Sequence, residues 1–381
     1  MHLLRHQTRH AVSVAVVLVA LVALLAGCGP TQTGAPHAPA PVAAAPRVAL
    51  GAGVRNVDVI VEPDDGVRAM TRAIRDATRS IWLTMYLLTN RTIIHALEYA
   101  HASGVQVRVI LEPHPYGTMS NSNRYAYNNL MAADIPVHWA SPRFRLTHEK
   151  CMIVDGATAY IMTTNFTRSA FTHNREFAVV DHDARDVATL RALFSADWND
   201  RPYAPRDPNL PVSPADARPL LTALIRSARH TLDVYAEELQ DTGMERTLAA
   251  TARHGVRVRV ILPAPSGPDR DASGVARISA AGAQVHRLRQ SYLYVHAKAI
   301  IADGRRAFVG SENLSTASLD HNREVGVIVA DPSAIQTLES TFDRDWARHR
   351  RPPPRASSVA ARACQHTGGT ARVNTRCRAR A

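Results

Sequence analysis

Only two lysines occur in this chain of 381 residues, and both lie in the same local pattern. Of the 45 lysine and arginine residues, 43 are arginine, and the exceptions, Lys150 and Lys298, each follow a histidine by two positions. Lysine carries a compact point charge, whereas arginine presents a planar fork. A chain so biased toward arginine is expected to keep lysine where the fork does not serve. The doubled pattern of His148 with Lys150 and His296 with Lys298 is therefore the first candidate for chemistry.

The two patterns belong to a longer internal repeat. Polar residues that follow His148 recur after His296 at a constant displacement of 148 positions. Upstream, segment 104–111 matches segment 255–262 with a slightly larger offset, which a difference in loop length explains. The sequence therefore predicts an internal duplication. The displaced pairs are Asp155 and Asp303, Thr163 and Ser311, Asn165 and Asn313, Asn174 and Asn322, Arg175 and Arg323, and Glu176 and Glu324.

Each copy is predicted to alternate helices and strands. We expect the first copy over 51–201, the second over 215–348, and a linker with five prolines over 202–214. The fold class that follows is α/β, with two similar α/β sandwich halves related by a pseudo-twofold axis. In the first copy the apolar spacing predicts helices over 67–77, 93–102 and 184–198, and strands over 81–88, 105–111, 150–154, 157–162 and 177–180. The second copy repeats this order, from a helix over 219–229 to one over 334–348.

These elements would position the doubled pattern for phosphate chemistry. Residues i and i+2 of a strand point to one face, so His148 and Lys150 are expected to face the same way, as is the second pair. If the halves pack about the axis, both pairs can reach one cleft. Ammonium groups and the amides of Asn165 and Asn313 suit the nonbridging oxygens of a phosphate diester. One neutral histidine can attack phosphorus while the other, protonated, gives its proton to the leaving alkoxide.

These residues resemble the signature of the phospholipase D superfamily: His-x-Lys, an Asp separated from the Lys by four residues, and then Gly-Ser-x-Asn. The second copy carries the whole pattern between His296 and Asn313. The first copy has Met162 and Thr163 where the family has Gly and Ser, and the threonine keeps the hydroxyl. The resemblance spans roughly 54–348. It implies a phosphodiesterase that needs neither a metal ion nor another cofactor.

The resemblance also implies roles for the residues. A phosphohistidine forms on one histidine, and water or an alcohol then resolves it. The family pattern favours His148 as the nucleophile and His296 as the general acid, but the residues alone do not order them. Asp155 and Asp303 complete the motif as catalytic candidates, yet they sit at turns, where a structural role is favoured. The other expected roles are phosphate binding by Lys150, Lys298, Asn165 and Asn313, orientation of the histidines by Glu176 and Glu324, and support from Thr163 and Ser311.

Two further features keep two interpretations each. Arg175 and Arg323 can either touch substrate phosphate or form structural salt bridges. The segment 113–127 follows the carboxyl end of a predicted strand, where loops commonly line sites. It is therefore a candidate substrate contact, with an ordinary surface loop as the alternative.

The ends of the chain differ from the repeat in composition. Residues 1–27 place two arginines before an apolar run and resemble a bacterial lipoprotein signal, with Cys28 as the lipidated residue; an ordinary secretory signal is the alternative. Segment 28–50 reads as a Pro/Ala-rich tether and 349–381 as a basic tail. We therefore expect a lipid-anchored protein of the cell envelope, outside the cytoplasm and at the outer membrane where one exists.

The four cysteines are consistent with that compartment. Besides the anchor, Cys151 is predicted to be buried in a strand and inert. Cys364 and Cys377 of the tail can form a disulfide or remain two free thiols.

Three kinds of partner fit these features. A lipid-anchored enzyme meets membrane phospholipids at high effective concentration, so the first hypothesis is a monomer that hydrolyses phospholipids or transfers their phosphatidyl group. The net charge of +12 suits nucleic acid, so an extracytoplasmic nuclease acting on DNA or RNA is the alternative. A non-catalytic binder of anionic surfaces is the third, which the intact His, Lys and Asn of both copies disfavour.

Overall fold

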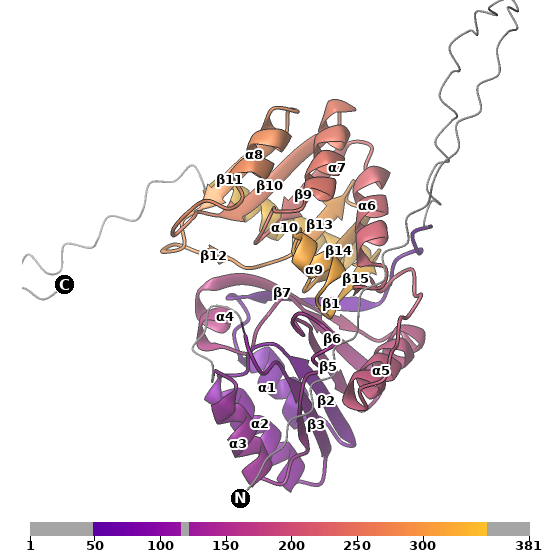
Figure 1. Cartoon of the computed structure of the whole chain (residues 1–381), viewed down its shortest axis with the longest axis vertical. Helices are drawn as coiled ribbons and strands as arrows, with labels where there is room; N and C mark the ends of the chain where they lie inside the picture. The colour runs from indigo at the N-terminus through magenta and orange to yellow at the C-terminus, as the bar shows by residue number, and fades with distance from the viewer. Residues whose placement is uncertain (1–48, 116–121, 349–381) are drawn as a thin grey trace, which may run out of the picture. The chain divides into compact units, whose positions relative to one another are not determined.

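The computed structural model describes residues 49–115 and 122–348 (Figure 1). The predicted signal, Cys28, nearly all of the tether, and the tail with Cys364 and Cys377 lie outside these residues. Within the described part of the chain, no helix has the length and apolar character needed to cross a membrane.

The first half is a mixed sheet with helices on its faces. Its strands lie in the order β1-β7-β6-β5-β2-β3-β4, and β12 of the second half pairs with β7. Strands β2 and β3 are parallel, as a helical crossover between them requires. The elements are β1 (Val57–Glu62), α1 (Arg68–Arg75), β2 (Ser80–Met85), α2 (Arg91–Ala102), β3 (Gln106–Leu111), α3 (Arg124–Ala132), β4 (Val137–Trp139), β5 (Lys150–Val154), β6 (Thr158–Met162), α4 (Arg168–Thr172), β7 (Asn174–Asp181) and α5 (Ala184–Trp198).

The second half has the same strand order. Its sheet reads β8-β15-β14-β13-β9-β10-β11, so that each strand has a counterpart in the first half. The predicted α/β fold with two similar halves is thereby confirmed. The elements are β8 (Val212–Ser213), α6 (Ala217–Ser227), β9 (Thr231–Tyr235), α7 (Thr242–Arg253), β10 (Arg257–Pro263), α8 (Ala272–Ser279), β11 (Gln284–Leu288), β12 (Tyr294–Val295), β13 (Ala299–Ala302), β14 (Arg306–Gly310), α9 (Thr316–Asp320), β15 (Glu324–Val329) and α10 (Pro332–Arg348).

Two local expectations need correction. The proline-rich segment 202–214 is not only a linker, because it contains β8, which pairs with β15. The histidines do not lie inside the strands: β5 begins at Lys150, and His296 and Lys298 fall between β12 and β13. The reason is that the backbone before each strand leaves its own sheet to pair with the other half.

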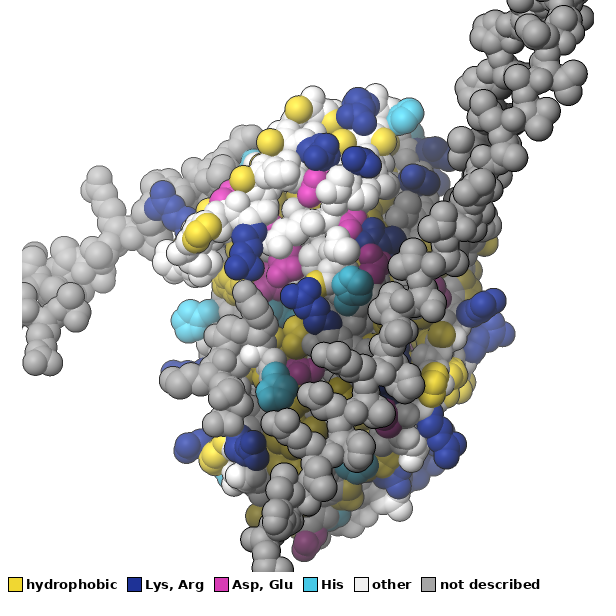
Figure 2. Space-filling model, viewed as in Figure 1, with side chains coloured by type: hydrophobic (Ala, Val, Ile, Leu, Met, Phe, Trp, Pro, Cys, Tyr) yellow, Lys and Arg dark blue, Asp and Glu magenta, His cyan; other side chains and the backbone are white. Residues whose placement is uncertain are grey.

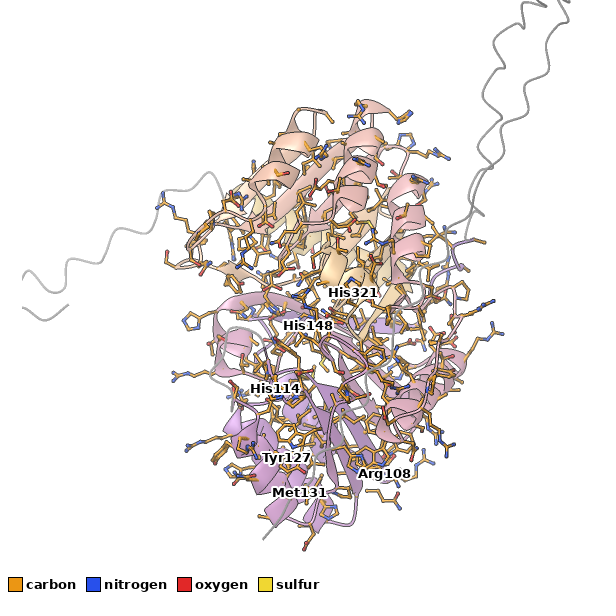
Figure 3. All side chains as sticks on the ribbon, viewed as in Figure 1. Arg108, His114, Tyr127, Met131, His148 and His321 are labelled. Atoms are coloured by element: carbon orange, nitrogen blue, oxygen red, sulfur yellow. The ribbon has the colours of Figure 1, made fainter. Side chains whose placement is uncertain are left out.

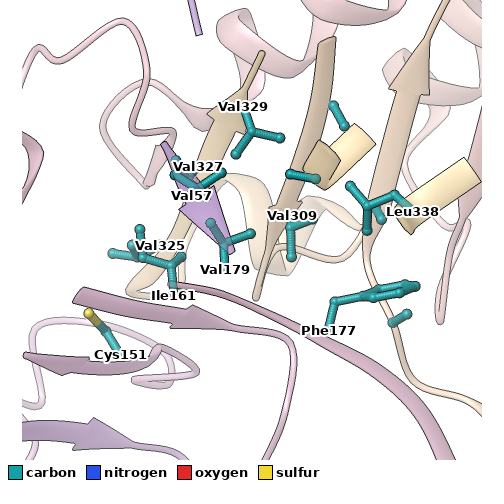
Figure 4. Packing of buried hydrophobic residues seen from close by; sticks show 14 of the residues in the cluster. Val57, Cys151, Ile161, Phe177, Val179, Val309, Val325, Val327, Val329 and Leu338 are labelled. Carbon is teal, nitrogen blue, oxygen red and sulfur yellow. The ribbon is translucent and has the colours of Figure 1, made fainter. Parts of the chain in front are cut away.

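A shared core joins the halves. One cluster of buried apolar residues draws on both sheets and on α5 and α10, whereas separate clusters lie under the remaining helices of each half. Figure 4 shows Phe177 of β7 close to Val309 of β14, and both belong to this cluster. Cys151 is buried in this cluster as a free thiol, as predicted. Each sheet therefore packs one face against the other sheet, beside α5 and α10, and its outer face against its remaining helices.

Candidate active site

One cavity collects the histidines and asparagines of both motifs. It has a volume of about 810 Å³, and its lining includes His148, His296, Asn165, Asn313 and Glu237. Figure 3 shows His148 where the ribbons of the two halves meet. The convergence predicted from the duplication is therefore present.

Reciprocal backbone pairing brings the two motifs together. The amide of His148 donates to the carbonyl of Arg323 at 2.9 Å, and the amide of His296 donates to the carbonyl of Arg175 at 3.2 Å. The second pair is the first displaced by one repeat, with the halves exchanged. Such an exchange is what a twofold axis requires of two equivalent contacts.

The orientation of His148 comes from the second half. Its Nδ1 lies 2.7 Å from Oε2 of Glu324, which leaves Nε2 for the cavity. Burial, assisted by the charge of Lys150, lowers the pKa of His148 to about 4 although Glu324 opposes the shift. His148 is therefore neutral near pH 7, the state in which Nε2 has a free lone pair.

The orientation of His296 comes from the first half. Its Nδ1 lies 2.9 Å from the carboxylate of Glu176. The two predicted orienting glutamates thus contact histidines, but crosswise: each histidine depends on the half to which it does not belong. The spacing within one copy contains no signal for this exchange.

The hydroxyl groups that support the two glutamates differ. Thr163 donates to Glu176 at 2.7 Å, as a supporting residue should. The equivalent Ser311 instead donates to the carbonyl of Val325 at 3.4 Å. Glu324 receives its hydroxyl from Ser318 at 2.6 Å. Ser318 was not identified from the sequence, because the first copy has an alanine at the matching position.

Both lysines are buried beside their histidines. Lys150 donates to the carbonyl of His148, and its Nζ lies 4.8 Å from the ring centroid of Tyr86. Burial lowers the pKa of Lys150 to about 7. Lys298 donates to the carbonyl of His296 at 2.6 Å and forms an ion pair of 2.6 Å with Glu237. The two lysines therefore have unlike surroundings.

The two asparagines also have different surroundings. Asn165 lines the cavity, and its buried Oδ1 has no hydrogen-bond partner among the described residues. Asn313 also leaves Oδ1 unpaired, but its Nδ2 donates to Glu237 at 3.3 Å. Unpaired buried polar atoms are uncommon and are often completed by a ligand. Because phosphate oxygens only accept hydrogen bonds, Nδ2 and not the unpaired Oδ1 of each amide would contact a bound phosphate.

Glu237 is a second site residue that sequence reasoning missed. It follows β9 and approaches Lys298, Asn313 and His296. Burial raises the pKa of Glu237, but electrostatic interaction with His296 and Lys298 outweighs burial and holds this pKa well below the usual range. The available signal was the upstream repeat: the larger offset aligns Glu237 with Tyr86.

Asp155 and Asp303 do not line the cavity, which favours their structural interpretation over a catalytic role. Asp155 accepts backbone hydrogen bonds from Thr78, Arg79 and Ser80 at the start of β2, which is the end away from Tyr86. Asp303 holds Arg229, His230 and Thr231 at the start of β9 in the same way. Both aspartates have a positive φ (55° and 53°) at the turn before the next strand. The motif aspartate is structural.

The arginines of the repeat are also structural. Arg175 is fully buried and donates to Asp345 at 2.6 Å. Arg323 donates to Asp197 at 3.1 Å. Of the candidate loop 113–127, His114 lines the cavity, whereas residues 116–121 lie outside the described part.

Comparison with known proteins agrees with this site. The family model described as "Cardiolipin synthase, PLD-like domain" matches residues 70–198 and 221–346. Cardiolipin synthase 1 of Staphylococcus aureus (strain MRSA252) is 22% identical over 348 residues, covering 77% of this chain and 68% of that protein. The probable cardiolipin synthase YwiE of Bacillus subtilis (strain 168) is 33% identical over 129 residues, covering 33% of this chain and 25% of that protein. This chain thus spans between a quarter and about two thirds of these relatives.

Solved structures share the fold. Phosphatidylserine synthase of Haemophilus influenzae Rd KW20 superposes with a TM-score of 0.59 at 13% identity, over 78% of this chain and 87% of that chain. Polyphosphate kinase from Porphyromonas gingivalis gives a TM-score of 0.61 at 20% identity, over 77% of this chain and 48% of that chain.

A paired His-x-Lys site between two equivalent α/β halves, matched by the family model in both, places the chain in the phospholipase D superfamily. The chain belongs to the family of phospholipase D-like domains of the cardiolipin synthase type. Members of this family are phosphodiesterase-type enzymes.

Proposed function

We propose that the protein moves the phosphatidyl group of a phospholipid to an acceptor alcohol, or to water, through a covalent phosphohistidine. One observation supports this above the others. Two histidines face one cavity, and each has Nδ1 held by a carboxylate of the opposite half. This arrangement presents two Nε2 atoms to a single phosphodiester, one to attack and one to protonate.

In the first step, Nε2 of His148 attacks phosphorus and the bond to the leaving alkoxide breaks. His296 gives its Nε2 proton to that oxygen, so the head-group alcohol leaves neutral. Lys150, Lys298, Asn165 and Asn313 would bind the nonbridging oxygens, whose negative charge grows toward the transition state. The products of this step are phosphatidyl-His148 and a neutral His296.

In the second step, His296 takes the proton of the acceptor hydroxyl as its oxygen attacks phosphorus. The bond between phosphorus and Nε2 of His148 breaks, and both histidines return to their starting states. An alcohol acceptor yields a new phospholipid, whereas water yields phosphatidic acid. Because the family model and the curated relatives carry the name cardiolipin synthase, we favour transfer to an alcohol.

The distribution of charge on one face of the molecule also favours lipid over nucleic acid. Figure 2 shows arginine side chains scattered over the visible face, with acidic side chains among them. A protein that follows a nucleic acid backbone typically gathers its positive charge in a patch or stripe. We include in this proposal the lipid anchor at Cys28 and an extracytoplasmic location, which would place the site next to its substrate.

The test presents the full chain with both substrate classes in excess chelator. Phosphatidylglycerol in mixed micelles and supercoiled plasmid DNA are incubated separately, with His148→Ala as the control. We expect lipid conversion without plasmid cleavage, and mass spectrometry then separates a transferred phosphatidyl product from phosphatidic acid. Plasmid cleavage without lipid conversion would reject the proposal in favour of a nuclease. Loss of activity on chelation would reject the metal-independent route.

A further inference from the structure

Glu237 occupies the place where the phosphate ligands of the second half converge. Its carboxylate lies 2.6 Å from Nζ of Lys298 and 3.5 Å from Nε2 of His296. Nδ2 of Asn313 donates to it at 3.3 Å, and the hydroxyl of Tyr294 donates at 3.0 Å. A buried carboxylate therefore contacts the histidine, the lysine and the asparagine of one motif.

The equivalent place in the first half holds an aromatic ring. Tyr86 corresponds to Glu237, because β2 pairs with β5 in the register in which β9 pairs with β13. The ring of Tyr86 lies edge-on to His148, with centroids 4.5 Å apart. The only carboxylate paired with His148 among the described residues is Glu324, at Nδ1. The two histidines thus differ at Nε2, the atom that faces the phosphate.

His296 lies between two carboxylates. Glu176 accepts from Nδ1, and Glu237 faces Nε2. A neutral imidazole has one N–H donor, whereas the imidazolium has two, so only the protonated ring can donate to both glutamates. Among the described residues, other charged or titratable groups against the ring include Lys298, whose Nζ is 3.2 Å from Nδ1 and 3.5 Å from Nε2, and Tyr294. The charge of Lys298 is itself paired with Glu237.

We propose that Glu237 is a positioning residue that keeps a proton on Nε2 of His296 and thereby makes His296 the proton donor of the first step. The inference rests on the proposed function, which it deepens. The Glu237 carboxylate faces the Nε2–H group of His296 until the leaving-group oxygen replaces the carboxylate. The proton then passes from Nε2 to that oxygen as the P–O bond breaks. His148, which faces Tyr86 instead, remains the neutral nucleophile.

The same carboxylate has a cost for substrate binding. A phosphodiester is an anion and must compete with Glu237 for Lys298 and Asn313. The neutral isostere Glu237→Gln should therefore lower KM while it lowers kcat. A carboxylate that served only to hold the fold would not divide the two constants in this way.

The experiment compares two lipids that share the phosphatidyl group and differ in the leaving group. Phosphatidylglycerol releases an alkoxide that needs a proton, whereas phosphatidyl-p-nitrophenol releases a stable phenolate. With the full chain, we measure release of the first alcohol or phenol in the pre-steady state. Glu237→Gln should slow the glycerol lipid about 100-fold, a typical contribution of general acid catalysis, and the nitrophenyl lipid less than about 5-fold. Glu238→Gln, which removes a neighbouring carboxylate of the same cavity, should show no such selectivity.

Histidine ¹⁵N NMR tests the inference without any lipid. At pH 7 the His296 signal, assigned with His296→Ala, should be that of an imidazolium in the wild type and of a neutral ring in Glu237→Gln. A neutral His296 in the wild type would overturn the inference. Equal losses on both lipids would also overturn the inference, because Glu237 would then be structural. Unchanged or faster release from both lipids would overturn it too, because Glu237 would then only compete with phosphate. If the wild type converts neither lipid, the proposed function fails, and the NMR result alone decides the role of Glu237.

Discussion

The two halves share a backbone plan but differ at the side chains that face the substrate. Strand order, the aspartate that holds the start of β2 or β9, and the crosswise histidine–glutamate contacts are the same in both. Tyr86 and Glu237, at one equivalent position, are not. In a reaction that needs one nucleophile and one acid, a difference between the two half-sites can decide which histidine takes each role. The duplication supplies the frame, and the difference at one position supplies the asymmetry.

Packing differs between the halves as well. A Cβ at Gly310 would lie 2.5 Å from Cα of Gly326 and 2.7 Å from the ring of Phe308. The first half has Met162 and Ala178 at the corresponding positions, both buried in its outer core. Close packing around Gly310 in the second half thus explains the glycine of the family motif. The first half has no such requirement, and methionine fits there as a buried core residue.

Substitution of the two histidines should have the largest effects on turnover and should show most directly which role each half plays. His148→Ala and His296→Ala should each reduce turnover of phosphatidylglycerol by at least about 10³-fold, because each removes one of two required roles. With phosphatidyl-p-nitrophenol, His296→Ala should still accumulate a covalent phosphatidyl adduct, detected by intact-protein mass spectrometry. An adduct on His148→Ala instead would reverse the assignment of the two halves.

The orienting glutamates should have the next largest effect. Glu324→Gln and Glu176→Gln should each reduce kcat about 100-fold or more, since a carboxamide does not hold the histidine tautomer or stabilise the imidazolium as a carboxylate does. Stopped-flow measurement of leaving-group release from both lipids distinguishes the two variants. Glu324→Gln should slow both leaving groups, and Glu176→Gln chiefly the alkoxide. Glu98→Gln on α2 is the matched control, and an equally large loss there would point to a general defect.

A smaller effect is expected from pH. A lowered pKa means that Lys150 loses its positive charge as pH rises through about 7, while His148 becomes neutral above about 4. The free enzyme should therefore show kcat/KM rising through pH 4 and falling above pH 7, by up to about tenfold per pH unit. Arginine stays charged in this range, so Lys150→Arg should move the upper limb to higher pH at a lower maximum. An upper limb that stays in place would assign it to another group.

Substitutions at the unlike packing positions should change stability more than turnover. Met162→Ala should destabilise the first half by about 2–5 kcal/mol, because it leaves a cavity. Gly310→Ala should cost about 1–3 kcal/mol through overpacking against Phe308. Urea denaturation followed by circular dichroism measures both. A neutral Gly310→Ala would remove the packing explanation of the motif glycine.

Much of the fold and part of the site could be predicted from the sequence. The duplication located most strands and required the two histidines to be equivalent, and the motif named both lysines and both asparagines. The crosswise glutamates could not be assigned to their histidines, since residue spacing describes one copy and not the contact between copies. The two-residue strand β8 was hidden among prolines. Glu237 and Ser318 break the repeat, so the method that found the other residues passed over them.

The crosswise contacts also bear on biosynthesis. His148 and its carboxylate partner are separated by 176 positions, so a ribosome delivers the nucleophile long before Glu324, near the end of the second half. Until that strand has emerged and docked, the nascent chain carries a histidine without its orienting partner. Catalytic competence would then begin only when the last strand of the second sheet is in place.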